Sequence, residues 1–318
     1  MLRRRLVTIP AIVLGFLLLT PLLPVVGLVA LVVDLVRAQF RLPTARLVLF
    51  GWWYLLAETL GLVVLSVSWL TTLGRPDARK AQTFAVQRWW SGTLYLGLRA
   101  LFGFRIELEE ADARLDTGPY VLLMRHASIA DTLVPSITIA NPYGINLRYV
   151  LKSELLVDPC LDIAGNRVPN VFVRRGRAGA DIPAVAALAE GLGPDGAVLI
   201  YPEGTRFTAE KRRRLVESGR RRIAQQAEQL RHVLPPRPGG PAALVRAGHD
   251  VVFLAHRGLE GLAGIRDLLD GALIGARVTA ETWRVRAADV DLDRIDEWLF
   301  EQWLRVDGWI ASAIPASE

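Results

Sequence analysis

Of the 318 residues in the chain, 52% are hydrophobic, and the mean hydropathy of +0.29 is higher than a purely soluble protein needs, so a membrane segment is expected. The net charge of +6 comes from arginine, which favours anionic lipid or a phosphorylated substrate as the partner. Because the sequence has no nucleic-acid-binding motif, nucleic acid is not the expected partner. Cys160 is the only cysteine, which excludes an intrachain disulfide and a cysteine-rich zinc site.

Two long apolar runs open the chain. The first, over residues 6–33, has no charged residue and would make a helix of about 42 Å, longer than the hydrocarbon core of a bilayer at about 30 Å. The second, over residues 47–73, is interrupted only by Glu58, which is either functional or buried against its neighbour. We therefore expect a membrane anchor over residues 1–80 and a catalytic domain over residues 81–318.

Arginine clusters flank these runs, at residues 3–5, 37–46 and 75–80. Positive charge prefers the cytoplasmic side of a membrane. Two spanning helices would leave the middle cluster outside, whereas two re-entrant hairpins would keep all three clusters inside. Two spanning helices are preferred, because only the first run has a central proline pair, and the hairpin alternative stays open. In both arrangements the protein is located in the cell membrane with its catalytic domain facing the cytoplasm.

Tryptophan and tyrosine lie beside arginine over residues 83–101. This pattern is typical of an amphipathic helix at a membrane interface, and a buried helix of the globular domain would explain it as well.

From residue 104 onward, short apolar runs alternate with helical segments. The expected strands cover residues 105–109, 120–124, 147–151, 171–173, 198–201, 251–255 and 278–285. The expected helices cover residues 129–140, 182–191, 211–231 and 295–312. This alternation predicts an α/β domain with a central, mostly parallel sheet flanked by helices.

A histidine and an aspartate follow the strand at residues 120–124. His126 comes directly after the strand, and Asp131 lies at the start of the next helical segment. If the chain turns sharply between them, the carboxylate fixes the imidazole so that its other nitrogen accepts a proton from a substrate hydroxyl. By itself the spacing also suits a solvated turn with a structural histidine. Ser128 lacks a nucleophile-elbow context, so covalent catalysis is disfavoured.

A second motif, residues 202–206, follows the strand at residues 198–201. Gly204 lets backbone amides approach a ligand closely, and Arg206 can bind phosphate in a bidentate manner. Glu203 is expected to hold Arg206 or to accept a hydrogen bond from a glycerol hydroxyl. A turn with a surface ion pair is the structural alternative.

In their order, these motifs resemble the 1-acyl-sn-glycerol-3-phosphate acyltransferases, a family of membrane-bound glycerolipid acyltransferases. The resemblance covers roughly residues 85–312 and implies the fold of that family. It implies that His126 and Asp131 are catalytic and that a second block, residues 172–176, binds the acceptor. The substrate-binding residues implied are Arg174, Arg175, Glu203, Gly204, Thr205 and Arg206. Residues 251–254 match a fourth block, but without its usual proline. Arg125 stands where many members have asparagine, and Arg174 occupies a position that is often acidic.

The resemblance implies transfer of a fatty acyl group from an acyl-CoA or acyl carrier protein thioester to a lysophospholipid, with no metal and no cofactor. The preferred reaction converts 1-acylglycerol-3-phosphate to phosphatidate. Another lyso-lipid acceptor, with an inositol, cardiolipin or glycolipid headgroup, is an alternative. A lipase or transacylase that uses the same histidine and aspartate is another.

Overall fold

The computed structural model of the protein describes residues 2–111, 113–174, 180–262 and 264–312. The helices are α1 (Leu2–Val36), α2 (Pro43–Thr71), α3 (Pro76–Phe102), α4 (Leu133–Pro135), α5 (Asn141–Tyr143), α6 (Pro159–Gly165), α7 (Ile182–Ala187), α8 (Ala209–Val216), α9 (Arg221–Gln229), α10 (Gly239–Val245), α11 (Ile265–Leu269) and α12 (Ile295–Ala311). The strands are β1 (Arg105–Ala111), β2 (Tyr120–Met124), β3 (Asn146–Lys152), β4 (Val171–Val173), β5 (Gly196–Ile200), β6 (Asp250–Arg257) and β7 (Arg277–Val285).

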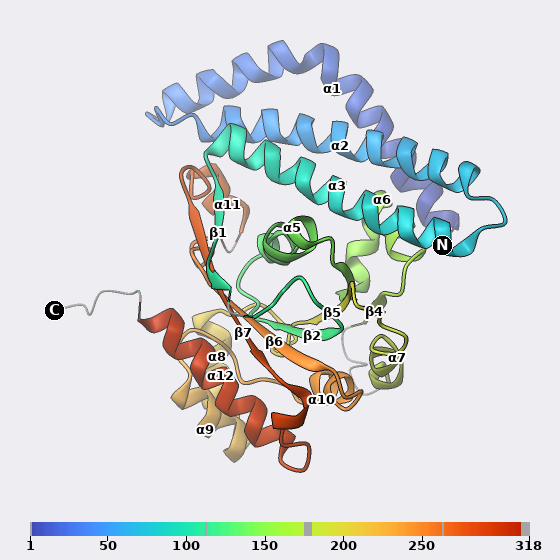
Figure 1. Cartoon of the computed structure of the whole chain (residues 1–318). Helices are drawn as coiled ribbons and strands as arrows, with labels where there is room; N and C mark the ends of the chain where they lie inside the picture. The colour runs from blue at the N-terminus through green and yellow to red at the C-terminus, as the bar shows by residue number, and fades with distance from the viewer. Residues whose placement is uncertain (1, 112, 175–179, 263, 313–318) are drawn as a thin grey trace.

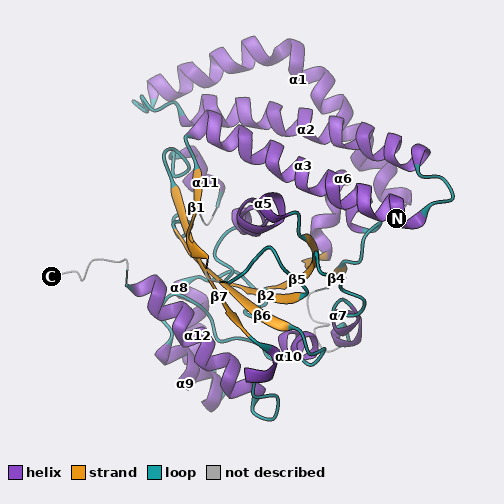
Figure 2. Cartoon of the chain, viewed as in Figure 1, coloured by secondary structure: helices purple, strands orange, loops and turns teal. Residues whose placement is uncertain are grey.

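The strands form one 7-stranded sheet in the order β1-β7-β6-β2-β5-β3-β4. Strand β2 is central and pairs in parallel with β5 on one side and β6 on the other. The pairing of β6 with β7 is antiparallel, and the remaining pairs are parallel. The prediction of an α/β domain with a mostly parallel sheet is therefore confirmed (Figure 2).

Both faces of the sheet are buried, which explains why the central strands are continuously apolar. In β2, Leu122 and Met124 face a core that includes Leu98 and Phe102 of α3. Val121 and Leu123 face the opposite core, to which α7, α10 and α12 contribute. The sheet thus separates the long N-terminal helices from the group formed by α8, α9 and α12 (Figure 1).

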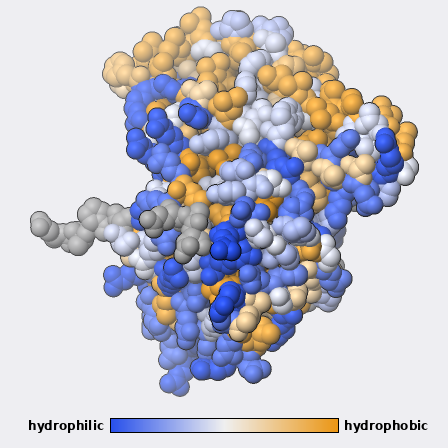
Figure 3. All heavy atoms as spheres, in the orientation of Figure 1, coloured by the Kyte–Doolittle hydropathy of each residue, from blue (hydrophilic) through white to orange (hydrophobic). Residues whose placement is uncertain are grey.

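Helices α1, α2 and α3 form a layer of their own along the first of these faces (Figure 1). The two apolar runs lie within α1 and α2, and α1 continues through Pro10, Pro21 and Pro24. Both helices are long and apolar enough to cross a membrane by length and composition. Most of the leucine and valine side chains of α1 are exposed, and apolar atoms gather over this layer in Figure 3.

Arginines tie both ends of α1 to the rest of the molecule. At its start, Arg4 and Arg5 form ion pairs of 2.8 and 3.1 Å with the fully buried carboxylate of Asp162 in α6. Just after its end, Arg37 pairs with Asp270 at 3.1 Å. The first and middle arginine clusters therefore both contact the domain that carries the sheet. Helices α1 and α2 pack together as one hairpin along that domain, rather than each run folding back on itself.

Glu58 is buried within this helical layer. Its carboxylate accepts hydrogen bonds from the Trp90 indole at 2.7 Å and from the Cys160 backbone at 3.3 Å. These contacts join α2 to α3 and α6, so the observed position agrees with the structural interpretation of this residue. Helix α3 contains the predicted segment 83–101 and packs between α2 and the core of the sheet domain.

Three expected helices differ from those observed. The helix expected over residues 182–191 is shorter, because α7 ends at Ala187. Residues 129–140 form a 3₁₀ turn, one α-helical turn and a π-helical turn instead of one regular helix. Residues 211–231 divide into α8 and α9, because Gly219 adopts a left-handed conformation with φ +67° that ends the first helix.

Candidate active site

Three parallel strands bring the two sequence motifs to one edge of the sheet. Strands β2, β5 and β6 are neighbours, so their carboxyl ends lie together, where ligands commonly bind in α/β folds. His126 follows β2 and Glu203 follows β5. The Phe207 backbone N–H donates to the carbonyl oxygen of His126 at 2.8 Å. The two motifs are therefore joined directly by a backbone hydrogen bond.

His126 and Asp131 make the hydrogen bond that their spacing suggests. Nδ1 of His126 lies 2.8 Å from Oδ2 of Asp131, whose side chain is fully buried. The backbone amides of Ala127 and Ser128 also donate to this carboxylate, at 2.6 and 2.9 Å, and hold it in place. Because a carboxylate oxygen accepts, Nδ1 carries the hydrogen and Nε2 is left as an acceptor. The imidazole remains 14% exposed, so Nε2 is available to a substrate.

Ser128 has a structural role. Its buried hydroxyl donates to the carbonyl oxygen of Leu262 at 3.1 Å and accepts from the Ala130 backbone at 3.3 Å. As the N-cap of the short 3₁₀ turn that carries Asp131, it helps to set the geometry of the histidine pair. These contacts agree with the expectation that Ser128 is not a nucleophile.

Tyr201 lies against the face of the imidazole, a contact that no motif in the sequence predicts. Its ring centroid is 4.6 Å from that of His126, with 34° between the ring planes. The Tyr201 hydroxyl is buried without a hydrogen-bond partner in the described chain. Burial, and then the nearby charge of Asp131, raise the pKa of this hydroxyl well above its usual range. The neutral tyrosine therefore confines the imidazole and presents a buried hydroxyl beside it.

Glu203 connects three loops. One of its oxygens accepts from the His126 backbone N–H at 2.9 Å, and the other accepts from the Leu234 backbone N–H at 2.9 Å. Its side chain is buried, and burial raises its pKa to about 8 against the opposing effect of these hydrogen bonds. The expected contacts were Arg206 or a glycerol hydroxyl, whereas the observed partners are backbone amides.

The rest of the second motif curls around a lysine. Gly204 has φ +66°, and a Cβ atom there would lie 3.3 Å from Cδ of Arg237, so both the backbone and the space favour glycine. Lys211 donates to the Thr205 hydroxyl at 3.0 Å and to the carbonyl oxygen of Arg206 at 2.7 Å. The motif thus collects positive charge at the carboxyl end of β5.

Arg125 and His256 lie beneath the histidine pair. The fully buried guanidinium of Arg125 donates to the His256 carbonyl and to Glu260, both at 2.6 Å, and to the His232 carbonyl at 3.0 Å. His256 Nε2 lies 3.2 Å from the Arg125 carbonyl oxygen and 3.7 Å from the second oxygen of Asp131. Burial lowers the pKa of His256, so a second, neutral imidazole faces the far side of this carboxylate.

The second basic block is less closely connected. Arg174 directly follows β4, the edge strand, and is exposed. Three strand spacings separate β4 from β2, which corresponds to about 14 Å. Arg174 therefore lies along the same sheet edge as His126 without touching it. Arg175 lies outside the described residues.

Two comparisons with known proteins found a similar sequence family and a similar fold. Residues 105–242 match the sequence model of the acyltransferase family. The crystal structure of PlsC, the 1-acyl-sn-glycerophosphate (LPA) acyltransferase of Thermotoga maritima, is similar with a TM-score of 0.54 and 14% sequence identity. The match covers 86% of this chain and 100% of that chain, and at this identity the likeness concerns the fold alone. The search of curated proteins found no match.

Proposed function

We propose, from the match of residues 105–242 to the sequence model of the acyltransferase family, that the protein moves a fatty acyl group from an acyl thioester to the free hydroxyl of a lysophospholipid. The preferred reaction converts 1-acylglycerol-3-phosphate to phosphatidate. The observation that carries the proposal is the His126–Asp131 hydrogen bond, held by backbone amides and joined to a basic loop.

His126 is the proposed general base. With Nδ1 donating to Asp131, Nε2 accepts the proton of the acceptor hydroxyl as its oxygen attacks the thioester carbonyl. The new ester C–O bond forms, the C–S bond breaks, and the imidazolium returns its proton to the departing thiolate. Asp131 fixes the tautomer and stabilises the imidazolium in between. No acyl-enzyme is required, since the hydroxyl attacks directly.

Positive groups at the same sheet edge would orient the acceptor. Arg206, with the Thr205 hydroxyl and the backbone at Gly204, is proposed to bind the glycerol phosphate. Arg174 and Arg175 are proposed to assist from the end of β4. The proposed role of Glu203 is indirect, because its two oxygens accept from backbone amides of loops that line the site.

The apolar helices suggest how the lipid arrives. The exposed apolar surface of α1 and α2 would insert into the lipid, while the arginines at both ends of α1 stay beside the catalytic domain. We propose that this hairpin enters the membrane from the cytoplasmic side, with residues 1–80 as the anchor and 81–318 as the catalytic domain. A lysophospholipid would then reach the site without leaving the bilayer.

An acceptor panel tests this function. The full chain in detergent micelles is given acyl-CoA with lysophosphatidate, lysophosphatidylinositol, lysocardiolipin or a lyso-glycolipid, and thiol release and lipid products are followed. We expect phosphatidate to form fastest. Thioester consumption that depends on water instead of a lyso-lipid would contradict acyl transfer.

A pair of arginine variants tests the phosphate contact. Arg206→Gln is expected to raise KM for the lysophosphatidate acceptor by about tenfold or more and to leave KM for the donor unchanged. Arg213→Gln, on the exposed side of α8, is the matched control. An unchanged acceptor KM in Arg206→Gln would remove this residue from the phosphate site.

A further inference from the structure

His256 is a fully buried polar residue in an otherwise apolar part of β6. Residues 251–255, which precede it in the strand, are all apolar and buried. Burying an imidazole costs free energy unless its polar atoms find hydrogen-bond partners, and Nδ1 of His256 has none among the residues that the structure describes. An apolar side chain would therefore serve the stability of this strand better, which points to another use for the imidazole.

The hydrogen on this ring can be placed from its contacts. Burial lowers the pKa of His256, so the ring is neutral and carries one hydrogen. Nε2 lies 3.2 Å from the Arg125 carbonyl oxygen and 3.7 Å from Oδ1 of Asp131, and both of these oxygens are acceptors. The hydrogen is therefore on Nε2, which donates to the carbonyl oxygen and presents its positive end to the carboxylate.

Arg125 and His256 hold each other through their backbones. The His256 side chain donates to the Arg125 carbonyl oxygen, and the Arg125 guanidinium donates to the His256 carbonyl oxygen at 2.6 Å. Arg125 directly precedes His126, so this exchange joins the end of β6 to the start of the turn that carries the histidine pair. Two reciprocal contacts thus fix the position of His256 beside Asp131.

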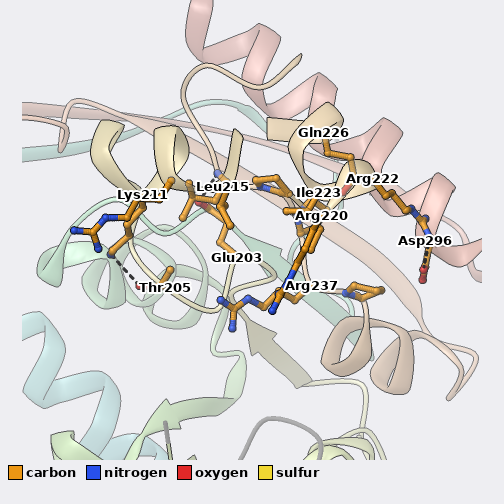
Figure 4. Close-up of a pocket in the computed structure, with 15 residues that line it drawn as sticks. Glu203, Thr205, Lys211, Leu215, Arg220, Arg222, Ile223, Gln226, Arg237 and Asp296 are labelled. Carbon is orange, nitrogen blue, oxygen red and sulfur yellow. Dashed lines mark hydrogen bonds and ion pairs between the residues drawn. The ribbon is translucent and has the colours of Figure 1, made fainter. Parts of the chain in front are cut away.

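His256 is closed off from solvent. Its side chain is fully buried, and neither His256 nor Asp131 is among the described residues that line the cavity of about 700 Å³ shown in Figure 4. Glu203 and Thr205 of the second motif reach that cavity instead. His256 can therefore influence the reaction only through the residues that it contacts.

Other charged and titratable groups surround the carboxylate of Asp131. At the ends of β2 and β6, Arg125 forms an ion pair with Glu260 at 2.6 Å. At the end of β5, burial raises the pKa of both Tyr201 and Glu203, and neither of them supplies positive charge. The negative charge of the carboxylate is therefore met mainly by N–H donors, which are the backbone amides of the turn and the two imidazoles.

We propose that His256 is a positioning residue for the general base, because its Nε2–H faces Oδ1 of Asp131 and moderates the pull of this carboxylate on the proton of His126. The inference rests on the proposed function. A general base takes a proton from the hydroxyl and then returns it to the thiolate, so the proton must not be held too tightly. In a buried site of low dielectric, a nearby N–H stabilises a carboxylate even at a distance beyond that of a hydrogen bond.

Kinetics across pH measure this effect. His256→Met removes the N–H and keeps a side chain of similar length. Asp131 should then hold the proton of His126 more tightly, so the acid limb of the kcat/KM pH profile should move up by about 0.5 pH unit or more. On that limb kcat/KM should fall about threefold, and the difference from the parent should close at higher pH.

Two further variants separate this role from packing. His256→Gln places an amide N–H where Nε2 lies, so its acid limb should return to within about 0.2 pH unit of the parent. Val252→Ala removes buried volume from the same face of β6 without touching the carboxylate. It should lower the free energy of unfolding and leave the acid limb in place.

The same shift can be followed without turnover. Diethyl pyrocarbonate modifies neutral imidazole, and mass spectrometry reports the labelling of the partly exposed His126 at each pH. The acid limb of this labelling should move up in His256→Met as the kinetic limb does. In the unmodified chain grown with ¹⁵N-histidine, NMR at pH 7 should show a neutral His256 ring with its hydrogen on Nε2, assigned by its loss in His256→Gln.

Several results would overturn the proposal. These are a kcat/KM that falls equally at every pH in His256→Met, a limb that moves as far in Val252→Ala or His256→Gln, or a hydrogen on Nδ1 of His256. The last result decides against it even where His256→Met does not fold. If the labelling limb moves as expected but the unmodified chain transfers no acyl group, the proposed function fails and the coupling of His256 to the histidine pair stands. If acyl transfer occurs and neither limb moves in His256→Met, the role of His256 alone fails.

Discussion

Two buried carboxylates shape the site by binding backbone amides. Asp131 accepts from the turn that follows β2, and Glu203 accepts from that turn and from the loop at Leu234. Each carboxylate thus fixes chain segments around His126 in addition to any chemical role. The geometry of the histidine depends on both of them.

The raised pKa of Glu203 predicts a pH-dependent stability. The pKa of Glu203 is about 8 in the folded protein and 4.5 in the unfolded chain. Between pH 4.5 and pH 8, the folded state therefore keeps a proton on this carboxyl that the unfolded chain has lost. The stabilisation that this proton gives to the folded state is therefore complete below pH 4.5. As pH rises to 8, the free energy of unfolding falls by up to about 4 kcal/mol. Glu203→Gln lacks this titration.

Chemical denaturation of both proteins in detergent at several pH values measures this effect. The free energy of unfolding of the parent should fall relative to that of Glu203→Gln as pH rises from 5 to 8. A constant difference between the two proteins across this range would show that Glu203 is ionised in the folded state throughout.

The histidine pair could be predicted from the sequence, whereas its surroundings could not. His126 lies just after an apolar strand, and the turn to Asp131 is local. The spacing of the two residues was therefore sufficient to predict their hydrogen bond. His256 approaches Asp131 only because β6 lies beside β2, and the order of strands in a sheet is not a local property of the sequence. A usable signal was present for both residues, since His256 directly follows the predicted strand 251–255 and Tyr201 is the last residue of the predicted strand 198–201.

Among the larger elements, strands were predicted better than helices. Strands β2 and β4 have the predicted bounds, because a strand buried on both faces appears as an unbroken apolar run. Helices α6 and α10 were not predicted, since helices of 7 residues gain their stability mainly from tertiary packing. The break between α8 and α9 has a local cause in Gly219.

The ion pairs between α1 and α6 give a testable link between the first helix and the domain that carries the sheet. Arg4→Ala/Arg5→Ala leaves the buried carboxylate of Asp162 without its cationic partners, which is expected to cost about 3 kcal/mol of unfolding free energy. Arg3→Ala is the matched control, because Arg3 is exposed. Denaturation in detergent measures both, and equal effects of the two changes would show that the ion pairs contribute little.

Across the whole molecule, apolar and hydrophilic surfaces lie on opposite sides of the sheet. Helices α1 and α2 expose apolar side chains over one end of the molecule, whereas the opposite end, with α8, α9 and α12, is mostly hydrophilic (Figures 1 and 3). The proposed function would use this order, with the lysophospholipid reaching the sheet edge from the apolar side.

The hairpin predicts where the connection between α1 and α2 lies. Phe40, in this connection, is 78% exposed, and the nearby Arg37 forms an ion pair with Asp270, which follows α11. The test introduces Phe40→Cys or Leu73→Cys in a Cys160→Ala background. Each new cysteine should be protected from an impermeant maleimide in intact cells and should be labelled in inverted vesicles. Labelling of the Phe40→Cys protein from outside would favour two spanning helices instead.

The most direct test of the central claim compares two histidines of the same chain. Acyl-CoA and lysophosphatidate are supplied to the His126→Gln and His249→Gln proteins, and thiol release is recorded. His249 is a partly buried histidine that is hydrogen-bonded to the Ala189 carbonyl. Loss of the general base should lower kcat by about 10²–10⁴-fold in His126→Gln, and His249→Gln should keep the parent rate. Equal rates in the two variants would contradict the assignment of His126 as the base.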